Sequence, residues 1–413
     1  MVTRASVAAI LVARTTTKED GVGDALVFWA VVAARVLVPL GVFRFPLPTM
    51  IAALVIDGLD QTIFQTFTSL PLDGYQSYDK ALDVYYLSLA YLAMQRNWVS
   101  RDGFDVGRFL YYYRLVGVVL FEQTQIRALL LVFPNTFEYF FDTYEAIRTR
   151  WDPRRLARGL LIGIAAFIWI VIKLPQEWWI HVAQLDATDL IKERIFGVSA
   201  DTPWPEAIAA APWVIVVVLV TLVALFVTAR WIVLHRLPPA DHPFTVDADR
   251  HQPMVEGDAI DRERRAIAEK FVSLELLEKF VLIGLISFIF SRMLPDVDVS
   301  AVDLLLGVAV VVIANTAISS ALVRRGDRPH GAVAQFVLTL AINVGIVLVG
   351  QLVVSGLRGT QLENALVFVL LLSLIVTCYD RYRPLYKARF ANGPLPMPRG
   401  AGDGQATGAA GAG

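Results

Sequence analysis

Acidic side chains recur at helical spacing in three stretches of the first half of the chain. At about 100° of rotation per residue, each stretch places its acids on one face of a helix. Carboxylates at membrane depth are costly, and they usually face a cavity or a partner and take part in handling protons or cations. The three stripes are Asp57/Asp60/Gln61/Gln65, Asp79/Asp83/Tyr86 and Glu138/Asp142/Glu145, with Asn135 or Thr136 as the expected cap of the third helix.

A fourth polar stretch, KLPQEWWIHVAQLDATD, covers residues 173–189. Trp178 and Trp179 are typical of the aromatic belt at a membrane surface, and we expect Lys173 to extend its ammonium group to the outer surface. These roles do not account for His181, which titrates near neutral pH when unperturbed. If Pro175 starts a helix, one line of side chains consists of Glu177, His181, Gln184 and Thr188.

Ionisable groups also interrupt the apolar run at residues 109–133. We expect Arg114, Glu122 and Arg127 to lie on one membrane span. Glu122 is expected to pair with an arginine of its own or another helix, which would form a buried structural ion pair.

Together these groups predict a polar cavity that is open to the outside and handles protons or cations. Each stripe also has a structural alternative: an aqueous loop for the first, a position above the membrane for the second, and the wet face of an interfacial helix for the third. The candidates are Asp57, Asp60, Gln61, Asp83, Arg114, Glu122, Arg127, Glu138, Asp142, Glu177 and His181, with Lys173, Trp178 and Trp179 as interfacial anchors.

Composition predicts that these groups lie on transmembrane helices. Of 413 residues, 56% are apolar and 18% are charged, whereas soluble domains carry about 25% charged residues. A bilayer core of roughly 30 Å needs about 20 apolar residues in a helix. We therefore predict an all-α, polytopic integral membrane protein with about eight to ten spans. Residues 46–67 and the segment after Pro134 are expected to form either spans or re-entrant and interfacial pieces.

Composition divides the chain into six segments. The largest is an N-terminal bundle rich in ionisable groups, whose last part, residues 173–210, is expected to face outward. The segments are a polar tail at 1–24, the N-terminal bundle at 25–210, one span at 211–236, a linker with a charged helix at 237–270, the C-terminal membrane helices at 271–380, and a basic and then disordered tail at 381–413.

The distribution of arginine and lysine predicts the orientation. Basic residues cluster at 148–158, 236–270, 324–328 and 381–389, whereas the connections near 295–300 and 356–361 hold one at most. Basic loops usually stay in the cytoplasm, so we expect the linker and the C-terminus there. The high Ala, Val and Arg content with few lysines suggests a bacterial protein of the inner membrane.

Several chemistries are disfavoured. A net charge of −1 argues against nucleic-acid binding. Phosphate-loop, dinucleotide and HExxH motifs are absent, and the linker histidines have no metal-ligand spacing. The single cysteine, Cys378, excludes an internal disulfide and is expected to be a small buried apolar group. We therefore expect no cofactor and no metal centre.

Three functions fit these observations, and we favour the first. A secondary transporter or ion-coupled permease would use Asp57, Asp60 or Glu138 for the coupling ion and Arg114 or Arg127 for an anionic group. A non-catalytic assembly protein would present the polar stripes to a membrane partner subunit. An enzyme acting on a lipid or isoprenoid phosphate would hold Mg²⁺ between Asp57 and Asp60. The expected surroundings are the lipid bilayer and a small solute, ion or lipid substrate.

Overall fold

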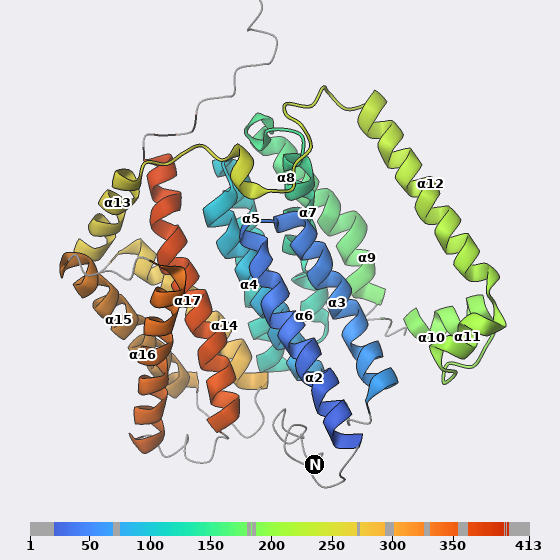
Figure 1. Cartoon of the computed structure of the whole chain (residues 1–413), viewed down its shortest axis with the longest axis horizontal. Coiled ribbons are helices and arrows are strands. Elements are labelled where there is room, and N and C mark those ends of the chain that lie inside the picture. The colour runs from blue at the N-terminus through green and yellow to red at the C-terminus, as the bar shows by residue number, and fades with distance from the viewer. Residues whose placement is uncertain are drawn as a thin grey trace, which may run out of the picture.

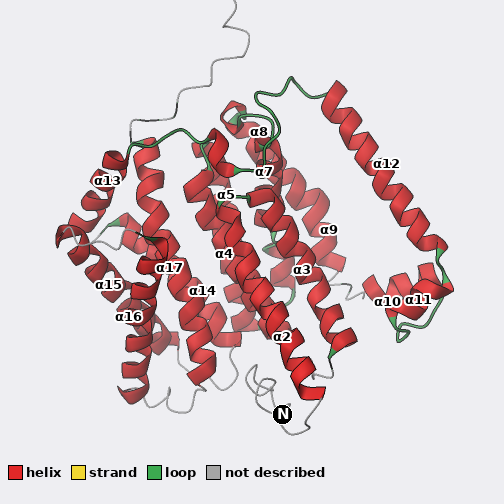
Figure 2. Ribbon diagram, in the orientation of Figure 1, coloured by secondary structure: helices red, strands yellow, loops and turns green. Residues whose placement is uncertain are grey.

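The computed structural model describes residues 20–68, 75–179, 187–270, 273–293, 301–325, 331–353 and 362–391, together with residues 183, 393 and 395. Within these ranges every regular element is a helix, as Figure 2 shows. Most long helices run side by side in one bundle, and α12 (Trp213–His235) stands apart from it (Figure 1). The predicted all-α fold is confirmed.

Six helices of the described residues are long and apolar enough to cross a membrane. They confirm the prediction of a helical membrane protein. Three of them lie in the first half of the chain, and Arg158–Glu177 passes through a π-helical turn at Ile168–Lys173. The six comprise α2 (Asp20–Leu37) with the 3-10 turn Val38–Phe43, α3 (Pro46–Phe67), α8 (Arg158–Phe167) continuing into α9 (Leu174–Glu177), α12, α15 (Ala301–Arg325) and α16 (Ala332–Val353).

Four further long helices pack in the same bundle. They are α4 (Tyr75–Asn97), α5 (Arg101–Thr124), α14 (Leu274–Met293) and α17 (Leu362–Phe390). Each carries at least four charged residues, against three at most in any of the six apolar helices. The sequence estimate of eight to ten spans includes these helices, so the number of crossings stays a prediction.

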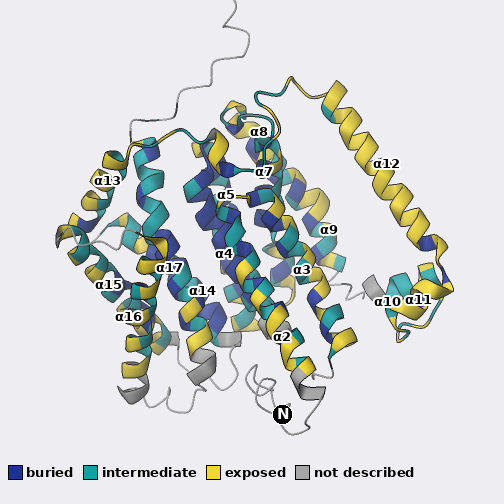
Figure 3. Cartoon of the chain, viewed as in Figure 1, coloured by how far each residue is buried: buried dark blue, intermediate teal, exposed yellow. Residues whose placement is uncertain are grey.

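Helix α4 forms the centre of the bundle. Nearly all residues from 82 to 97 are buried (Figure 3). Tyr91 stacks on Tyr111 of α5, with ring centroids 4.5 Å apart, and donates a hydrogen bond to Glu278 of α14 at 2.5 Å. Aromatic residues with a polar end suit such positions, because their rings pack while the hydroxyl groups find partners. The mixed polarity of α4 therefore reflects surroundings of protein rather than lipid.

Helix α3 is one continuous element of 22 residues. Pro46 and Pro48 lie in its first turn, where the missing N–H groups have no intrahelical partner to lose. The prolines therefore start the helix rather than open a re-entrant loop, and the re-entrant alternative is wrong.

The apolar run at residues 109–133 does not form one span. Helix α5 ends at Thr124, and Gln125 adopts a left-handed conformation with φ 55°. A short helix, α6 (Ala128–Val132), follows before the chain turns at Pro134. The prediction that Arg114 and Arg127 share one helix is therefore wrong, because the left-handed residue terminates α5 between them.

Helix α7 (Thr136–Arg148) is only 13 residues long, and it packs against α3, α5 and α8. Glu138 and Glu145 are buried, with 4% and 2% of their surface exposed. The alternative of an interfacial helix with a wet acidic face is therefore wrong. The predicted side-chain cap is also absent, because Asn135 at the N-cap accepts no bond from the helix backbone.

The long linker after α12 lies across one end of the bundle. The Asp241 backbone N–H donates to the Arg150 carbonyl at 2.9 Å, and its carboxylate pairs with Arg155 at 2.9 Å. Farther along, Asp249 pairs with Arg96 at 2.7 Å. The linker then enters α13 (Gly257–Glu269), beside α15 and α17. Figure 1 shows the linker and the C-terminal end of α17 at the same end of the molecule.

Helix α12 is exposed on every side in its most apolar stretch, of which 0% is buried (Figure 3). Two short helices precede it, α10 (Ala187–Ile191) and α11 (Trp204–Ala210). An apolar helix with this exposure is suited to surroundings of lipid.

Candidate functional site in the N-terminal bundle

Arg35 is surrounded by four aspartates. Its guanidinium donates hydrogen bonds to Asp79 at 2.7 Å and to Asp83 at 3.0 Å, and it also contacts Asp57 and Asp60. The Arg35 and Asp60 side chains are buried, with 3% and 0% exposed. The other three carboxylates keep 27–37% of their side chains exposed. We name these five residues the Arg35 cluster. Arg35 and Asp60 form its buried part, and Asp57, Asp79 and Asp83 form its accessible rim.

Helical periodicity brings the Arg35 cluster together. Asp57 and Asp60 are one turn apart in the middle of α3, and Asp79 and Asp83 are one turn apart near the start of α4. Arg35 lies in the last turn of α2. Because α2 packs against both α3 and α4, its long side chain reaches both acidic pairs.

The Arg35 cluster carries more negative than positive charge. If all groups are ionised, four carboxylates and one guanidinium leave a net charge of −3. Closely spaced like charges at a poorly solvated site disfavour full ionisation. One carboxylate oxygen from each of Asp57, Asp79 and Asp83 lies within 4.8 Å of the others, a spacing that suits a shared cation. The cluster is therefore chemically suited to take up protons or a cation.

A second group of polar side chains surrounds Glu138, at the start of α7. One oxygen of Glu138 accepts a hydrogen bond from Tyr86 at 2.5 Å, and the other accepts from the Asn135 amide at 2.8 Å. The Asn135 backbone N–H donates to Glu177 at 3.4 Å. The Lys173 ammonium lies 3.9 Å from the ring centre of Tyr139. We name Tyr86, Asn135, Glu138, Lys173 and Glu177 the Glu138 cluster.

Tyr86 connects the two clusters. It lies three residues after Asp83 on α4, so both side chains share a face of that helix, and its hydroxyl donates to Glu138. A phenol can donate to one carboxylate and accept from a second carboxyl group when that group is protonated.

The line of acids continues along α7 toward the end that carries the linker. One buried oxygen of Asp142 has no hydrogen-bond partner among the described residues. One turn on, Glu145 accepts hydrogen bonds from Trp98 Nε1 and from Arg148 Nε, both at 2.7 Å. A small hollow bordered by Glu145, Arg148 and linker residues lies at this end. Titratable groups therefore follow one another from the Arg35 cluster to the linker.

The structure brings together six of the eleven proposed site residues in these two clusters or beside them. Arg114 also belongs to this region, because it donates to the Phe133 carbonyl, two residues before Asn135, at 2.9 Å. The six are Asp57, Asp60, Asp83, Glu138, Asp142 and Glu177.

Three proposed residues lie elsewhere, and one is outside the described residues. Gln61 is exposed, one position beyond Asp60. Arg127 is exposed in the break between α5 and α6. Glu122 pairs with Lys80 at 3.3 Å, and no arginine of the described ranges pairs with it. His181 lies outside the part of the chain that the structure describes.

The three predicted interfacial anchors differ in their exposure. Trp178 is half exposed and Trp179 partly exposed, at the end of α9. Lys173, in contrast, is 4% exposed, because its side chain turns inward over Tyr139 in the Glu138 cluster. The expectation that Lys173 extends to the outer surface is therefore wrong.

Arg35, Asp79 and Tyr86 belong to the site but are not among the candidate residues that the sequence indicates. Arg35 gave a usable signal, because a lone arginine within an apolar run needs anionic partners. The helical spacing of Asp79, Asp83 and Tyr86 is also visible in the sequence. Their partners on other helices are not: Arg35 for the two aspartates and Glu138 for Tyr86.

No protein-family model, curated protein or solved structure matches the chain.

Proposed function

We propose that this membrane protein is an ion-coupled transporter whose coupling ion, a proton or a small cation, binds at the Arg35 cluster. The observation that carries this proposal is the convergence of four carboxylates on one guanidinium, with three of the carboxylates accessible. Uncompensated acids within membrane helices are expensive, and they usually serve ion pathways.

The two parts of the cluster have different roles in this proposal. The buried Asp60 holds Arg35 in place, since an isolated buried guanidinium would be strongly unfavourable. Asp57, Asp79 and Asp83 form the rim where charge is taken up and released. Tyr86, Glu138, Asp142 and Glu145 then provide the route toward the linker end.

Flux through reconstituted protein tests this proposal. Purified full-length chain in liposomes with an internal pH-sensitive dye is exposed to imposed proton, sodium or potassium gradients, with and without added solutes. We expect the wild type to move protons or cations. The double variant Asp79→Asn, Asp83→Asn should lower the flux about tenfold or more, because it removes two of the rim carboxylates.

Asp105→Asn is the matched control. Asp105 forms an exposed pair with Arg108 at 3.5 Å, outside both clusters, so its loss should leave flux unchanged. Equal flux in the wild type and in the double variant, or none in the wild type under any gradient, would contradict transport through this site.

A second candidate function is a membrane-embedded enzyme that uses Mg²⁺ on a lipid phosphate. The observation that favours it is the triad Asp57, Asp79 and Asp83, since three carboxylates are typical ligands of a divalent ion. The sequence-based pair Asp57 and Asp60 is less suitable, because Asp60 is buried against Arg35. Calorimetry with Mg²⁺ or Mn²⁺ distinguishes the two functions: saturable divalent binding that Asp79→Asn abolishes, without ion flux, would favour the enzyme.

We also propose that the linker and the C-terminus lie in the cytoplasm of a bacterial cell, with the protein in the inner membrane. The basic loops support this orientation, and the linker and the end of α17 lie together at one end of the bundle (Figure 1).

A non-catalytic assembly protein that binds a partner subunit is the third possibility from the sequence. Trp178 and Trp179 would offer exposed apolar area to such a partner.

A further inference from the structure

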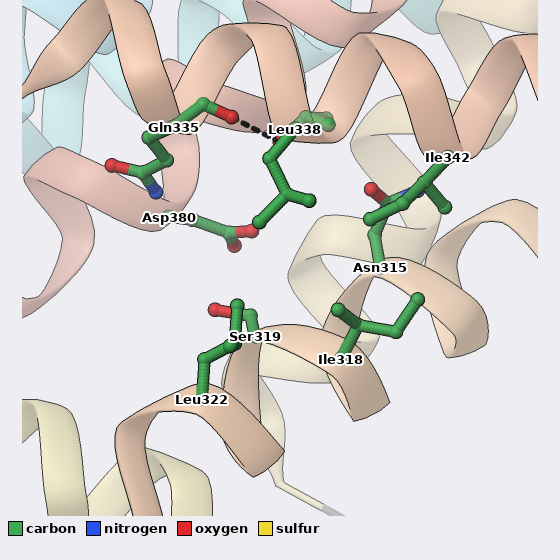
Figure 4. A pocket seen from close by; sticks show the side chains of 9 residues that line it. Asn315, Ile318, Ser319, Leu322, Gln335, Leu338, Ile342 and Asp380 are labelled. Atoms are coloured by element: carbon green, nitrogen blue, oxygen red, sulfur yellow. Dashed lines mark hydrogen bonds between the residues drawn. The ribbon is translucent and has the colours of Figure 1, made fainter. Parts of the chain in front are cut away.

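A small polar pocket lies in the other half of the molecule, between α15, α16 and α17. Its hollow measures about 40 Å³, and its polar lining includes Asp380, Gln335, Ser319 and Thr339. Figure 4 shows the Asp380 carboxylate, the Gln335 amide and the Ser319 hydroxyl around one space. A water molecule requires about 10–15 Å³ of such a cavity, so the hollow has room for roughly three water molecules.

A buried lysine pairs with the carboxylate that lines this pocket. Lys279 of α14 is 3% exposed, and its ammonium lies 2.8 and 2.9 Å from the two oxygens of Asp380. It also donates to Thr316 of α15 at 3.3 Å. Asp380 therefore has a tethered ammonium on one side and a hollow on the other.

One polar residue of the lining, Asn315, helps to hold these helices together. Asn315 donates to Asn343 at 2.6 Å, and Asn343 donates to Ser373 at 2.9 Å. These two buried bonds already join α15, α16 and α17, in the way that amides commonly join membrane helices. The Gln335 amide and the Ser319 hydroxyl, which face the hollow, take no part in these two bonds.

We propose that this pocket binds a small monovalent cation, with Lys279 as a built-in competitor for Asp380. The pocket offers one carboxylate, the amide oxygen of Gln335 and the hydroxyl oxygens of Ser319 and Thr339, which are hard ligands suited to a hard cation. A single carboxylate balances one positive charge, so a divalent ion would leave excess charge in a poorly solvated site.

The competition follows from charge balance. With no cation bound, Lys279 neutralises Asp380. When a cation enters, the two positive charges repel, and Lys279 gives one proton to solvent and stays as a neutral amine that still donates to Thr316. The site thus exchanges one positive charge for another without leaving the carboxylate unpaired.

Equilibrium binding of radiolabelled sodium and rubidium to the purified full-length protein tests the proposal. The background is the variant Asp79→Asn, Asp83→Asn, so that the measured binding does not come from the Arg35 cluster. In that background Lys279→Met should raise the affinity about tenfold, because the competitor is gone. Asp380→Asn should abolish binding, and Gln335→Leu should weaken it while leaving the Lys279–Asp380 pair in place.

Lys387→Met and Glu275→Gln are the matched controls. Lys387 and Glu275 form a lysine–carboxylate pair at 2.8 Å on the same two helices, outside the pocket. Both controls should bind as the background does. Thermal unfolding identifies any variant that fails to fold, and in that case Gln335→Leu and Lys279→Met decide. Absence of saturable binding in both the background and Lys279→Met would overturn the proposal, as would equal affinity in all variants.

Discussion

Arg35 is the residue on which the N-terminal site depends. It holds two acidic pairs from two helices, and its partner Asp60 has no exposed side-chain surface. A lysine offers one compact ammonium in place of a forked guanidinium with several donors, so Arg35→Lys is not a conservative change here.

Replacement of Arg35 by methionine should strongly destabilise the protein near neutral pH. The change leaves Asp60 buried without its cation, and breaking a buried pair in this way typically costs about 3–5 kcal/mol. Thermal unfolding in detergent measures the loss. Acidification should restore part of it, because protonated carboxyl groups no longer need the guanidinium.

Arg108→Met provides the comparison, since Arg108 and Asp105 are both about 40% exposed. Its effect should stay within about 0.5 kcal/mol. Similar unfolding temperatures for Arg35→Met and Arg108→Met would show that the Arg35 cluster contributes no stability.

Helical spacing in the sequence was sufficient to group Asp57 with Asp60 and Glu138 with Asp142 and Glu145. It could not assign partners on other helices, because the pairing of α2 with α3 and α4 is a property of the folded bundle. It also could not tell that Lys173 turns inward, since the same side chain can reach the membrane surface or an internal aromatic ring.

At the scale of elements, the connection from α5 to α7 positions the Glu138 cluster. Gly117 of α5 lies directly against Phe133, so that an added Cβ would lie 2.1 Å from the Phe133 Cβ. The Phe133 carbonyl in turn accepts from Arg114. Close packing at one glycine therefore places the segment that leads into Asn135 and Glu138.

Gly117→Ala should displace this segment and destabilise the fold by about 1–3 kcal/mol, as is typical of overpacking. Because Phe133 must shift, the variant should also lower any flux that depends on Glu138. Thermal unfolding and the liposome assay measure the two effects.

Gly163→Ala in α8 is the matched control, because an added Cβ at Gly163 meets nothing within 4 Å. It should be neutral or slightly stabilising, since alanine favours a helix more than glycine does. Equal effects of the two substitutions would contradict the packing argument for Gly117.

The sequence predicted the plain apolar helices α12, α15 and α16 well, because uniform hydropathy over about 20 residues is a strong signal. It failed at the end of α5, where hydropathy continues through a break made by one left-handed residue. It was also ambiguous for α7, since a helix buried within a polar bundle resembles an interfacial helix in composition.

In the molecule as a whole, the linker between α12 and α13 contacts several helices at one end of the bundle. Trp151 donates to the Pro238 carbonyl at 3.1 Å, and the Thr245 N–H donates to the Thr149 carbonyl at 3.0 Å. Gln252 donates to Asn97 at 2.8 Å. The linker therefore joins the α7–α8 turn to the end of α4.

Asp241→Ala should release the first part of this linker. The substitution removes the pair with Arg155 and the acceptor for the Asp152 N–H at 2.9 Å. We expect faster proteolysis within residues 237–256, with the helical content unchanged. Glu256→Ala, at the exposed far end of the linker, should leave the cleavage rate as in the wild type.

Acid should loosen the turn at Asp152, whose backbone N–H donates to Asp241 of the linker. Burial alone raises the pKa of Asp152, but hydrogen bonds from the Arg154 side chain and backbone outweigh it and hold the pKa below its ordinary value. A carboxyl group with a lowered pKa contributes stability above its unfolded pKa and loses it as the pH falls through the folded pKa. Resistance to proteolysis should therefore be constant from neutral pH down to about pH 4 and fall below it. A loss already near pH 6 would contradict this assignment.

Infrared titration of the purified protein measures whether the rim of the Arg35 cluster takes up protons or a cation. Protonated carboxyl groups absorb apart from carboxylates, so the spectrum shows how many change state between acidic and neutral pH and on addition of sodium or potassium. We predict a carboxyl signal in the wild type that decreases when pH or cation concentration rises, and that Asp79→Asn, Asp83→Asn reduces while Asp105→Asn leaves it intact. An identical carboxyl titration in the wild type and the double variant would show that Asp79 and Asp83 take up neither protons nor a cation.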